Sequence, residues 1–511
     1  MAISYYVHFT HMEIAMTRDF STDVLICGAG AAGLTLAIDL ARRGISFRLI
    51  EKMDDAFRGS RGKGLQPRTL EVFEDLGIVE RIAATGGPYP PQREYAEDGT
   101  FTEQAVVQTD EPRVDEPYRV PLMIPQFLTE GTMRDRLAEF GHGVEFGCEL
   151  IGFEQDDDGV TARLIGKTGV EVVRSRYLVG ADGGRSFVRH ALGIGFPGKT
   201  LGVRAVVADV VLTGLDRDAW YRFNEGDMQR QIGLCPLAGT DLFQIQGPIS
   251  LEGDIDLSAE GLTALVSERT GRDIRVQSVS WASAFNMNAR LADCYRVGCV
   301  FLTGDAAHTH PPTGGQGLNT GVQDAYNLGW KLATVLRGGP VTLLDSYETE
   351  RRPIAAQMLG LATSLLDAMK RGEMRRGRET QQLDIGYPGS PLAFERPERA
   401  GGLLAGDRAP EAAIMGASGR PTSLFQLFKG PHWTLLGYEV ERSVVAPRYG
   451  LHIHTFGPRG DVVDQDDDVR RAYALTPGSW VLVRPDGYVG AIVSACEPAA
   501  LEDYFRTVGL D

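Results

Sequence analysis

A glycine-rich loop near the start of the chain has the residue types and spacing that bind phosphate. Its glycines are Gly28, Gly30 and Gly33. Glycines at this spacing permit a tight turn and close approach of a pyrophosphate, and the N-terminus of a following helix then faces the phosphates. The loop follows an apolar run at 23–27 and precedes an expected helix at 34–43, and Glu51 ends the next apolar run. A carboxylate there can accept hydrogen bonds from ribose hydroxyls, so we expect a β-α-β unit that binds a dinucleotide.

A second loop, far downstream, combines an aspartate with prolines and glycines. Asp305 follows the apolar run 298–304, and the sequence HPPTGGQGLN then leads into an expected helix at 318–336. Asp305 can accept a hydrogen bond from a ribityl hydroxyl. Backbone N–H groups at 317–319 lack partners within the first turn of the helix and can donate to an electron-rich flavin carbonyl. The loop therefore favours a flavin, and its alternative is a purely structural turn.

Two shorter motifs add to this pattern. Within 177–189, an apolar strand ends at Asp182 before an expected helix, so Asp182 is either a helix cap or a nucleotide contact. At 60–69, the glycine-spaced basic loop SRGKGLQPRT suits a mobile flavin or the phosphate of a pyridine nucleotide. The alternative for this stretch is an ordinary solvated loop.

Hydrophobic patterning predicts the elements that must position these residues. Apolar and alternating runs predict strands over 144–180 and a strand meander over 200–285, which we expect to form a second layer facing the first. Periodic apolar faces predict further helices at 69–76, 131–140 and 344–366. The strands and helices together predict an α/β fold.

The C-terminal part of the chain forms a third expected unit. It has apolar runs at 432–438, 451–456 and 479–493, with the turn Pro485–Asp486–Gly487 inside the last, and a helix at 498–508. The expected units are a flexible N-terminal extension at 1–20, a dinucleotide-binding domain at 21–199 and 286–370, a β-sheet substrate domain at 200–285, a linker at 371–404 and the third unit at 405–511.

Composition limits the class of partner. The formal net charge of −16 argues against nucleic acid or an anionic membrane as the main partner, and a tetra-anionic coenzyme such as NADPH would need a local basic patch. The 6 cysteines are scattered, without a Cys-x-x-Cys pair, which favours a reducing cytoplasm over a disulfide frame or a metal site. No apolar run reaches the length of a membrane span.

The four motifs, in this order, resemble those of the single-component FAD-dependent aromatic hydroxylases, the class of p-hydroxybenzoate hydroxylase and phenol hydroxylase. The resemblance covers residues 22–370 and implies a Rossmann-like FAD domain with a β-sheet substrate domain. In the third unit, AGDRAPEAAI, WTLLGY and SWVLVRPDGYVGAI resemble the thioredoxin-like C-terminal domain of the phenol hydroxylase and polyketide hydroxylase branch. Without a cysteine pair, we expect it to serve packing or homodimerisation rather than redox chemistry.

The resemblance implies a set of cofactor contacts. The glycine-rich loop and Glu51 would hold the ADP half of FAD, Asp305 the ribityl chain, and Pro312 to Asn319 would surround the isoalloxazine, while Asp182 would serve both FAD and NADPH. The candidate FAD contacts are Gly28, Gly30, Ala32, Gly33, Glu51, Lys52, Arg61, Gln126, Leu150, Asp182, Asp305, Pro312, Gly315, Gly317, Leu318 and Asn319.

The resemblance also implies a reaction. NADPH, with NADH as the alternative, would dock briefly and reduce a flavin that has swung outward, which agrees with the presence of only one dinucleotide loop. The reduced flavin would take O2 at C4a, and the C4a-hydroperoxide would pass OH to an electron-rich ring. Because the transfer is electrophilic, a hydrogen-bond acceptor beside a substrate phenol would assist it.

The expected substrate is a larger phenol or a polycyclic, polyketide-like aromatic. In the hydroxybenzoate enzyme, a serine and an arginine on a middle-layer strand hold the carboxylate, whereas the matching run here has Pro236 and Ala238. For each pocket candidate an ordinary core or surface role is the alternative, and His308 is expected to be structural. The candidates for lining the pocket are Tyr221, Gln231, Cys235, Phe243 and Pro312, and those for a catalytic role are His310, Tyr221 and Arg204.

Two other functions compete with aromatic hydroxylation. The same scaffold could carry out Baeyer–Villiger oxidation, epoxidation or oxidation that inactivates an antibiotic. A function of another class is non-catalytic FAD binding, with the third unit used for association. That function predicts no substrate-stimulated oxidation of NADPH.

Overall fold

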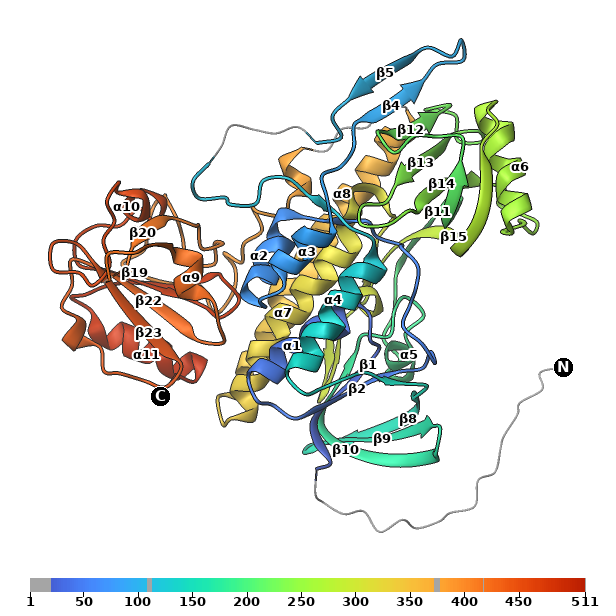
Figure 1. Cartoon of the computed structure of the whole chain (residues 1–511). Coiled ribbons are helices and arrows are strands. Elements are labelled where there is room, and N and C mark those ends of the chain that lie inside the picture. The colour runs from blue at the N-terminus through green and yellow to red at the C-terminus, as the bar shows by residue number, and fades with distance from the viewer. Residues whose placement is uncertain (1–19, 108–112, 372–376, 417, 511) are drawn as a thin grey trace.

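The computed structural model describes residues 20–107, 113–371, 377–416 and 418–510, so our expectations for residues 1–19 lie outside the described part. Two large sheets are joined by a bundle of helices, and a smaller sheet carries the C-terminal unit (Figure 1). Within the described ranges, no helix has the length and apolar character needed to cross a membrane.

The first sheet brings the sequence motifs to one edge. Its order is β16-β17-β10-β1-β2-β7, and β8 and β9 extend β10 as an antiparallel meander. β1 pairs in parallel with β10, and β10 with β17, so the C-terminal ends of these strands lie side by side. The loops that carry Gly28, Asp182 and Asp305 therefore open at the same edge. The bounds are β1 (Thr22–Cys27), β2 (Phe47–Glu51), β7 (Glu145–Phe146), β8 (Glu149–Asp156), β9 (Gly159–Gly166), β10 (Gly169–Gly180), β16 (Arg296–Val297) and β17 (Val300–Leu302).

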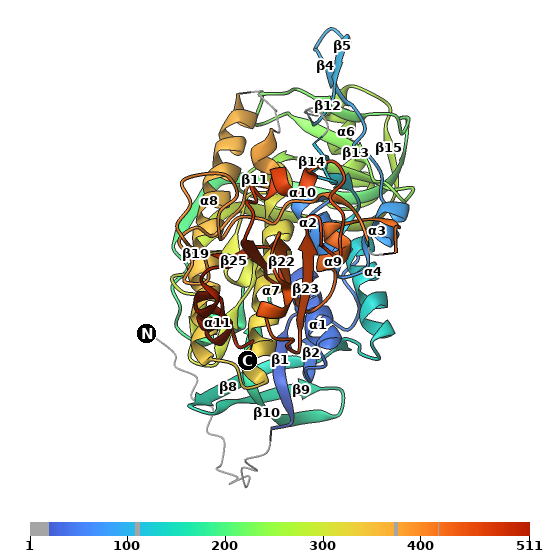
Figure 2. The same cartoon turned by 90° about the vertical axis from the view of Figure 1, so that its left-hand side faces the viewer.

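Helices pack beside this sheet in the centre of the molecule. α1 packs against both α4 and α7, and α7 also contacts α8 (Figure 1). α7 is buried over nearly its whole length, because α1 and the C-terminal unit cover different faces of it (Figure 2). The bounds are α1 (Ala31–Arg42), α2 (Pro67–Asp75), α3 (Val79–Thr85), α4 (Gln126–Glu139), α5 (Phe187–Ala191), α7 (Gln316–Leu336) and α8 (Asp345–Lys370). The helices expected from periodicity correspond to α1, α2, α4, α7 and α8.

The second sheet is larger than we expected. Its order is β18-β15-β11-β14-β13-β12-β4-β5, with α6 (Ala259–Thr270) packed on its outer face (Figure 1). The segment 92–104, which we placed in the first domain, supplies β4 and β5, because β4 pairs in parallel with β12. The bounds are β4 (Gln92–Tyr95), β5 (Phe101–Gln104), β11 (Gly198–Thr213), β12 (Trp220–Phe223), β13 (Ile232–Pro236), β14 (Phe243–Ile249), β15 (Arg275–Leu291) and β18 (His308–Thr309); the short strands β3 (Gly64–Leu65) and β6 (Leu122–Met123) pair separately.

The C-terminal unit has a mixed sheet of order β19-β25-β24-β22-β23 and lies in front of α7 in Figure 2. The expected hairpin turn joins β24 to β25, with Gly487 at φ 75°. The expected linker is wrong in one respect: residues 394–396 form β19, which pairs in parallel with β25 inside this sheet. The bounds are β19 (Phe394–Arg396), β20 (Ala413–Met415), β21 (Pro421–Ser423), β22 (Trp433–Tyr438), β23 (Leu451–Phe456), β24 (Ser479–Val483), β25 (Val489–Ser494), α9 (Leu424–Phe428), α10 (Asp468–Ala472) and α11 (Pro498–Val508).

A buried charge cluster joins the C-terminal unit to the helices. Arg484, after β24, donates to both carboxylate oxygens of Glu350 on α8, at 2.7 and 2.9 Å. Lys331 on α7 donates to Glu350 Oε2 at 2.7 Å, and Asp486 accepts from Arg484. All four side chains are buried, with two positive and two negative charges. Removing one partner would leave a buried charge uncompensated, which ties the unit firmly to α7 and α8.

Candidate functional site

The glycine-rich loop leaves open space at the N-terminus of α1. The fold itself requires Gly28 (φ 107°) and Gly33, because an added Cβ would lie 2.4 Å from Ala181 O and 2.0 Å from Gly28 O, respectively. At Gly30 an added Cβ would meet nothing closer than Glu130 Oε1, at 3.8 Å. No side chain caps α1, so its first N–H groups face this space. Close approach of an anion explains a glycine that packing does not require.

A buried carboxyl group borders the same space. Glu130 on α4 accepts a hydrogen bond from Gln126 Nε2 at 2.8 Å, and burial raises the pKa of Glu130 to about 7. Gln126 Oε1 accepts from Gly62 N at 3.4 Å, which ties α4 to the basic loop. A proton held by Glu130 near neutral pH lowers the negative charge beside an incoming phosphate.

Glu51 and Asp182 present carboxylate oxygens at this edge. Glu51 accepts from Ala29 N at 3.0 Å and from Met53 N at 3.1 Å. Asp182 Oδ2 accepts from Val188 N at 3.1 Å, in the first turn of α5. Its Oδ1 is buried without a hydrogen-bond partner among the described residues. The same carboxylate therefore caps a helix and retains an oxygen that a ligand hydroxyl would satisfy.

Asp305 lies on the turn Gly304–Ala306 that follows β17. Its side chain is exposed to the cleft and makes no hydrogen bond among the described residues. Loss of solvent within the cleft raises the pKa of Asp305, and the charges of His308 and Arg61 oppose the rise. Arg61 is exposed, with its guanidinium 5.4 Å from the ring centre of Phe57. An available carboxylate facing an exposed arginine fits a polar ligand chain.

Buried amides hold the proline- and glycine-rich turn before α7. Gly314 and Gly315 have φ values of 76° and 66°, which glycine adopts readily. Gly314 O accepts from Gln66 Nε2 at 3.0 Å and from Gln316 Nε2 at 2.8 Å. Asn319 Oδ1 accepts from Gln66 N at 2.8 Å, which joins the basic loop to the first turn of α7.

The remaining predicted FAD contacts, apart from two, lie in the first turns of α1 and α7. Ala32 lies in the first turn of α1, and Gly317 and Leu318 lie in the first turn of α7, which has no side-chain cap. Lys52 is exposed beyond β2, and the Leu150 side chain packs in the main hydrophobic core. The open space at Gly30, the orphaned Asp182 oxygen and the two uncapped helices fit FAD, and the individual contacts stay predictions.

An apolar cavity adjoins this cleft. Its empty space, counted out to its mouth, is ≈930 Å³. One wall is the Pro312–Gly314 turn, another is the inner face of the second sheet, and Leu365 and Met369 of α8 close a third. Two of the predicted lining residues, Gln231 and Pro312, do line it. The lining is mostly apolar with a few polar side chains, which is typical of small-molecule sites.

The other pocket candidates lie elsewhere, and our interpretation of them as lining residues is corrected. Tyr221 lies between the cavity-lining Trp220 and Arg222 on β12, so it faces the opposite side and packs against Tyr95. Phe243 belongs to the core on that same opposite side.

Successive side chains of a strand point to opposite faces, so Arg204 does not line the cavity either. Its strand neighbours Val203 and Ala205 line the cavity, while Arg204 donates to the carbonyl groups of Ser250 and Gly253 at the surface. Cys235 does not line the cavity; it packs in a small cluster with Val106, Met123 and the cavity-lining Trp220. Sequence reasoning missed most of the lining residues, which include Trp220, Arg222, Glu225, Met228, Gln246, Phe285, Met287, Leu365 and Met369.

His310 is engaged in a buried chain instead of lining the cavity. Its Nε2 lies 2.9 Å from His308 Nδ1, and His308 Nε2 lies 2.6 Å from Asp324 Oδ2. Arg351 donates to the other Asp324 oxygen at 2.7 Å. Burial lowers the pKa of His310 to about 3, so this imidazole is neutral. The geometry gives His308 the structural role that we expected. His310 lies next to His308 in the same chain of side chains and does not line the cavity.

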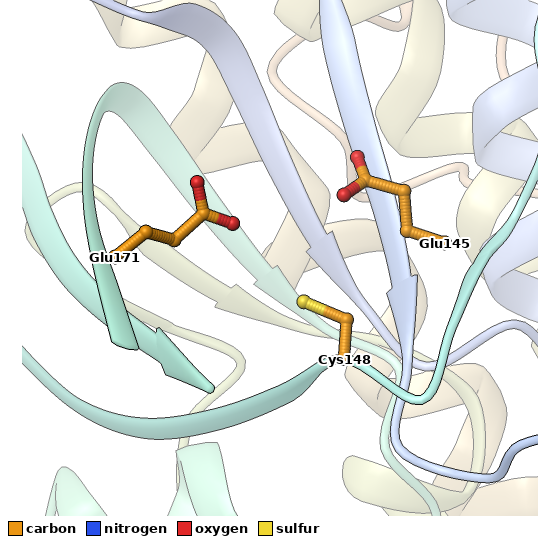
Figure 3. A group of neighbouring side chains, drawn as sticks. All are labelled: Glu145, Cys148 and Glu171. Carbon is orange, nitrogen blue, oxygen red and sulfur yellow. The ribbon is translucent and has the colours of Figure 1, made fainter. Parts of the chain in front are cut away.

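One cluster outside the cleft has metal-ligand residue types. Glu145, Cys148 and Glu171 lie close together at the end of the first sheet (Figure 3). Arg48 pairs with both carboxylates, at 2.5 Å for Glu145 and 2.7 Å for Glu171. These ion pairs account for the two acidic groups without a metal ion.

Known proteins resemble the chain over nearly its full length. The family model described as "FAD binding domain" matches residues 21–362, and "Aromatic-ring hydroxylase, C-terminal" matches 403–508. A flavin-dependent monooxygenase from Mycobacteroides abscessus is 42% identical over 92% of this chain and 97% of its own length. The 6-methylpretetramide 4-monooxygenase of Streptomyces rimosus is 33% identical over 92% of this chain and 90% of its own. The crystal structure of aklavinone-11 hydroxylase with FAD and aklavinone is similar with a TM-score of 0.79, 26% identity and coverage of 96% and 99%.

Proposed function

Because the chain belongs to the family of FAD-dependent aromatic-ring monooxygenases, we propose that it hydroxylates a polycyclic, polyketide-like phenol, with a reduced pyridine nucleotide as electron donor and O2 as oxygen source. The observation that carries the proposal is the apolar cavity beside the Pro312–Gly314 turn. Its mostly apolar lining suits a substrate of fused aromatic rings. Relatives named for 6-methylpretetramide and aklavinone support the same substrate class.

The cleft residues would hold FAD in three sections. The N–H groups at the start of α1 would bind the pyrophosphate, and Glu51 the adenosine ribose. Asp305 and the free oxygen of Asp182 would accept from hydroxyl groups of the cofactor. The uncapped N-terminus of α7 would stabilise negative charge on the ring system. Bound FAD supplies electron transfer and oxygen activation, while the protein orients the reactants and excludes water.

A basic surface hollow supports the proposed electron donor. Its lining has two arginines, Arg58 and Arg134, against one aspartate, Asp55, together with Ala56, Phe57 and Phe127. In a chain with a net charge of −16, such a local basic patch is what a tetra-anionic coenzyme needs. The hollow adjoins the exposed Arg61, which lies over Phe57. We therefore propose NADPH, with NADH as the alternative, as a transient visitor to this surface.

The test is substrate-dependent consumption of NADPH by the FAD-loaded protein. A panel of mono- and polycyclic phenols is scored by the rate of NADPH loss and by product mass. We expect polycyclic phenols to accelerate NADPH loss and to yield products heavier by one oxygen atom. A protein that binds FAD but never responds to any panel member would instead be a non-catalytic FAD-binding protein. Product structure separates ring hydroxylation from Baeyer–Villiger oxidation or epoxidation.

We also propose a cytoplasmic, homodimeric protein. Support for the compartment comes from the cysteines, which are free thiols. For the homodimer, we propose that two copies associate through the face of the third unit that does not pack against α7. The molar mass of the purified protein in solution tests the second point.

A further inference from the structure

The apolar cavity has a polar corner far from the Pro312–Gly314 turn, which the proposed function places beside the flavin. Arg222, on β12, and Glu225, just after it, both line the cavity and are almost fully buried. Arg222 Nε donates to Glu225 Oε1 at 2.5 Å, and Nη2 contacts the same oxygen. Among the described residues no hydrogen bond reaches Glu225 Oε2, so that oxygen is available to a second partner.

A third polar group completes this corner. Gln231 also lines the cavity and is buried, and its Nε2 donates to Met228 Sδ at 3.1 Å. Its Oε1 is buried without a hydrogen-bond partner among the described residues. A buried acceptor without a partner carries a free-energy penalty that a ligand hydroxyl would remove.

Packing alone does not explain a buried ion pair in this wall. Taking both charges out of water is unfavourable, and apolar residues of similar volume usually serve stability as well or better. Burial raises the pKa of Glu225, and Arg222 opposes the rise. A carboxylate with a raised pKa in a cavity is better able to take a proton from a bound ligand.

Resting on the proposed function, we propose that this corner binds an acidic phenol or enol of the substrate and ionises it, with Glu225 as the proton acceptor. The substrate O–H bond breaks, its proton forms an O–H bond at Glu225 Oε2, and its electron pair stays on the oxygen. Arg222 then pairs with the phenolate in place of the carboxylate, so the net charge in the corner is unchanged. Gln231 Oε1 accepts from a neighbouring hydroxyl.

The fold separates this corner from the oxidising end of the cavity. The Pro312–Gly314 turn follows β18, which pairs with β15, whereas Arg222 lies on β12. In the order β15-β11-β14-β13-β12 the strand spacing puts the axes of β15 and β12 ~19 Å apart. A conjugated multi-ring phenol can place its ionised oxygen at one end and deliver electron density to a ring at the other. A single small ring cannot reach both.

The test uses emodin, a polycyclic phenol whose colour changes on ionisation, added to the oxidised, FAD-loaded enzyme. At a pH at which free emodin is neutral, we expect the wild-type difference spectrum to show bound phenolate. Glu225→Gln should bind emodin in its neutral form and lower turnover by about 100-fold. Arg222→Met should weaken emodin binding by about 10- to 100-fold, because a charge-assisted hydrogen bond is lost.

Two further variants guard against misfolding and indirect effects. Arg222→Met combined with Glu225→Leu removes both charges of this pair together, so neither is left without the other. This variant should fold with a thermal stability close to that of the wild type and still show neutral emodin. Tyr221→Phe changes the same strand on its opposite face, and its spectrum should match the wild type. The trimethyl ether of emodin, which has no acidic proton, should bind the wild type and Glu225→Gln equally.

The outcomes separate this inference from the proposed function. If the wild type turns over phenols but binds emodin in its neutral form, or if Glu225→Gln still shows the phenolate, the corner does not ionise substrate, and hydroxylation stands. If no phenol binds or stimulates NADPH oxidation, the proposed function fails, and this inference fails with it.

Discussion

Substitution of two glycines in one loop should separate cofactor binding from folding. A methyl group at Gly30 has open space around it, with the nearest atom at 3.8 Å, so Gly30→Ala should change the stability of the apoprotein by less than about 1 kcal/mol. The same group should block the pyrophosphate from the first N–H groups of α1. Loss of two charge-assisted hydrogen bonds amounts to about 3 kcal/mol, or an affinity for FAD that is about 100-fold weaker.

Gly33→Ala should have the opposite effect. Its methyl group would lie 2.0 Å from Gly28 O, and relief of this overlap must move the backbone, with a stability loss of about 3 kcal/mol or more. Gly360→Ala is the matched control, because it adds a methyl group within α8 with no atom inside 4 Å. In that variant the free energy of unfolding should rise by up to about 1 kcal/mol, and the affinity for FAD should be unchanged.

The assay combines thermal unfolding of each apoprotein with titration of FAD, followed by quenching of flavin fluorescence. Gly30→Ala should unfold like the wild type and bind FAD weakly. If it binds FAD with wild-type affinity, the pyrophosphate does not approach the backbone at Gly30, and our placement of the cofactor on α1 is wrong. An apoprotein melting temperature that falls as far for Gly30→Ala as for Gly33→Ala would equally refute the reasoning from open space.

Three further predictions concern single side chains. Asp305→Ala should release FAD or prevent its reduction, measured by the flavin absorbance of the purified protein and by anaerobic NADPH titration; a yellow variant with normal turnover would contradict the assignment. Glu130 has a pKa of about 7 in the folded protein against an ordinary value of 4.5, so the folded state holds its proton to higher pH. The stability of the wild type should therefore fall relative to Glu130→Gln as pH rises from 4.5 to about 7, and parallel unfolding curves at every pH would contradict this. Arg484→Met should destabilise the protein by about 3–5 kcal/mol, because Glu350 loses its main partner in a fully buried site; denaturant unfolding tests it, and a loss below 1 kcal/mol would show that the cluster is not needed.

The sequence predicted the elements whose signal is local. The apolar run before Gly28, the helix after it and the apolar-faced helix after Leu318 follow from periodicity, and the structure has them as β1, α1 and α7. The convergence of their loops follows from parallel pairing, which family resemblance supplied. Long-range pairing was not predictable in this way: β4 joins the second sheet because it pairs with β12, more than one hundred residues later.

The pocket residues were harder to predict for a different reason. All four side chains of β12, Trp220 to Phe223, are buried, since the cavity lies on one face and a hydrophobic core on the other. Apolar and polar residues therefore do not alternate along β12, so the sequence does not show which side chains face the cavity. For this reason we placed Tyr221 on the wrong face. Arg222 was the available signal, because a charged residue in a buried strand needs a partner or a function.

The division of the two large sheets among sequence segments has a consequence for synthesis of the chain. The phosphate loop leaves the ribosome early, but the strand that delivers Asp305 pairs with β10 only after residue 302. The cavity wall begins with Val203 and closes with Met369 of α8. Nascent chains thus carry an incomplete flavin cleft until Asp305 and the start of α7 have been made, and an open apolar wall until Met369 has been made. Such late, long-range closure slows folding and exposes apolar surface meanwhile. Availability of FAD during expression should accordingly govern the yield of soluble protein.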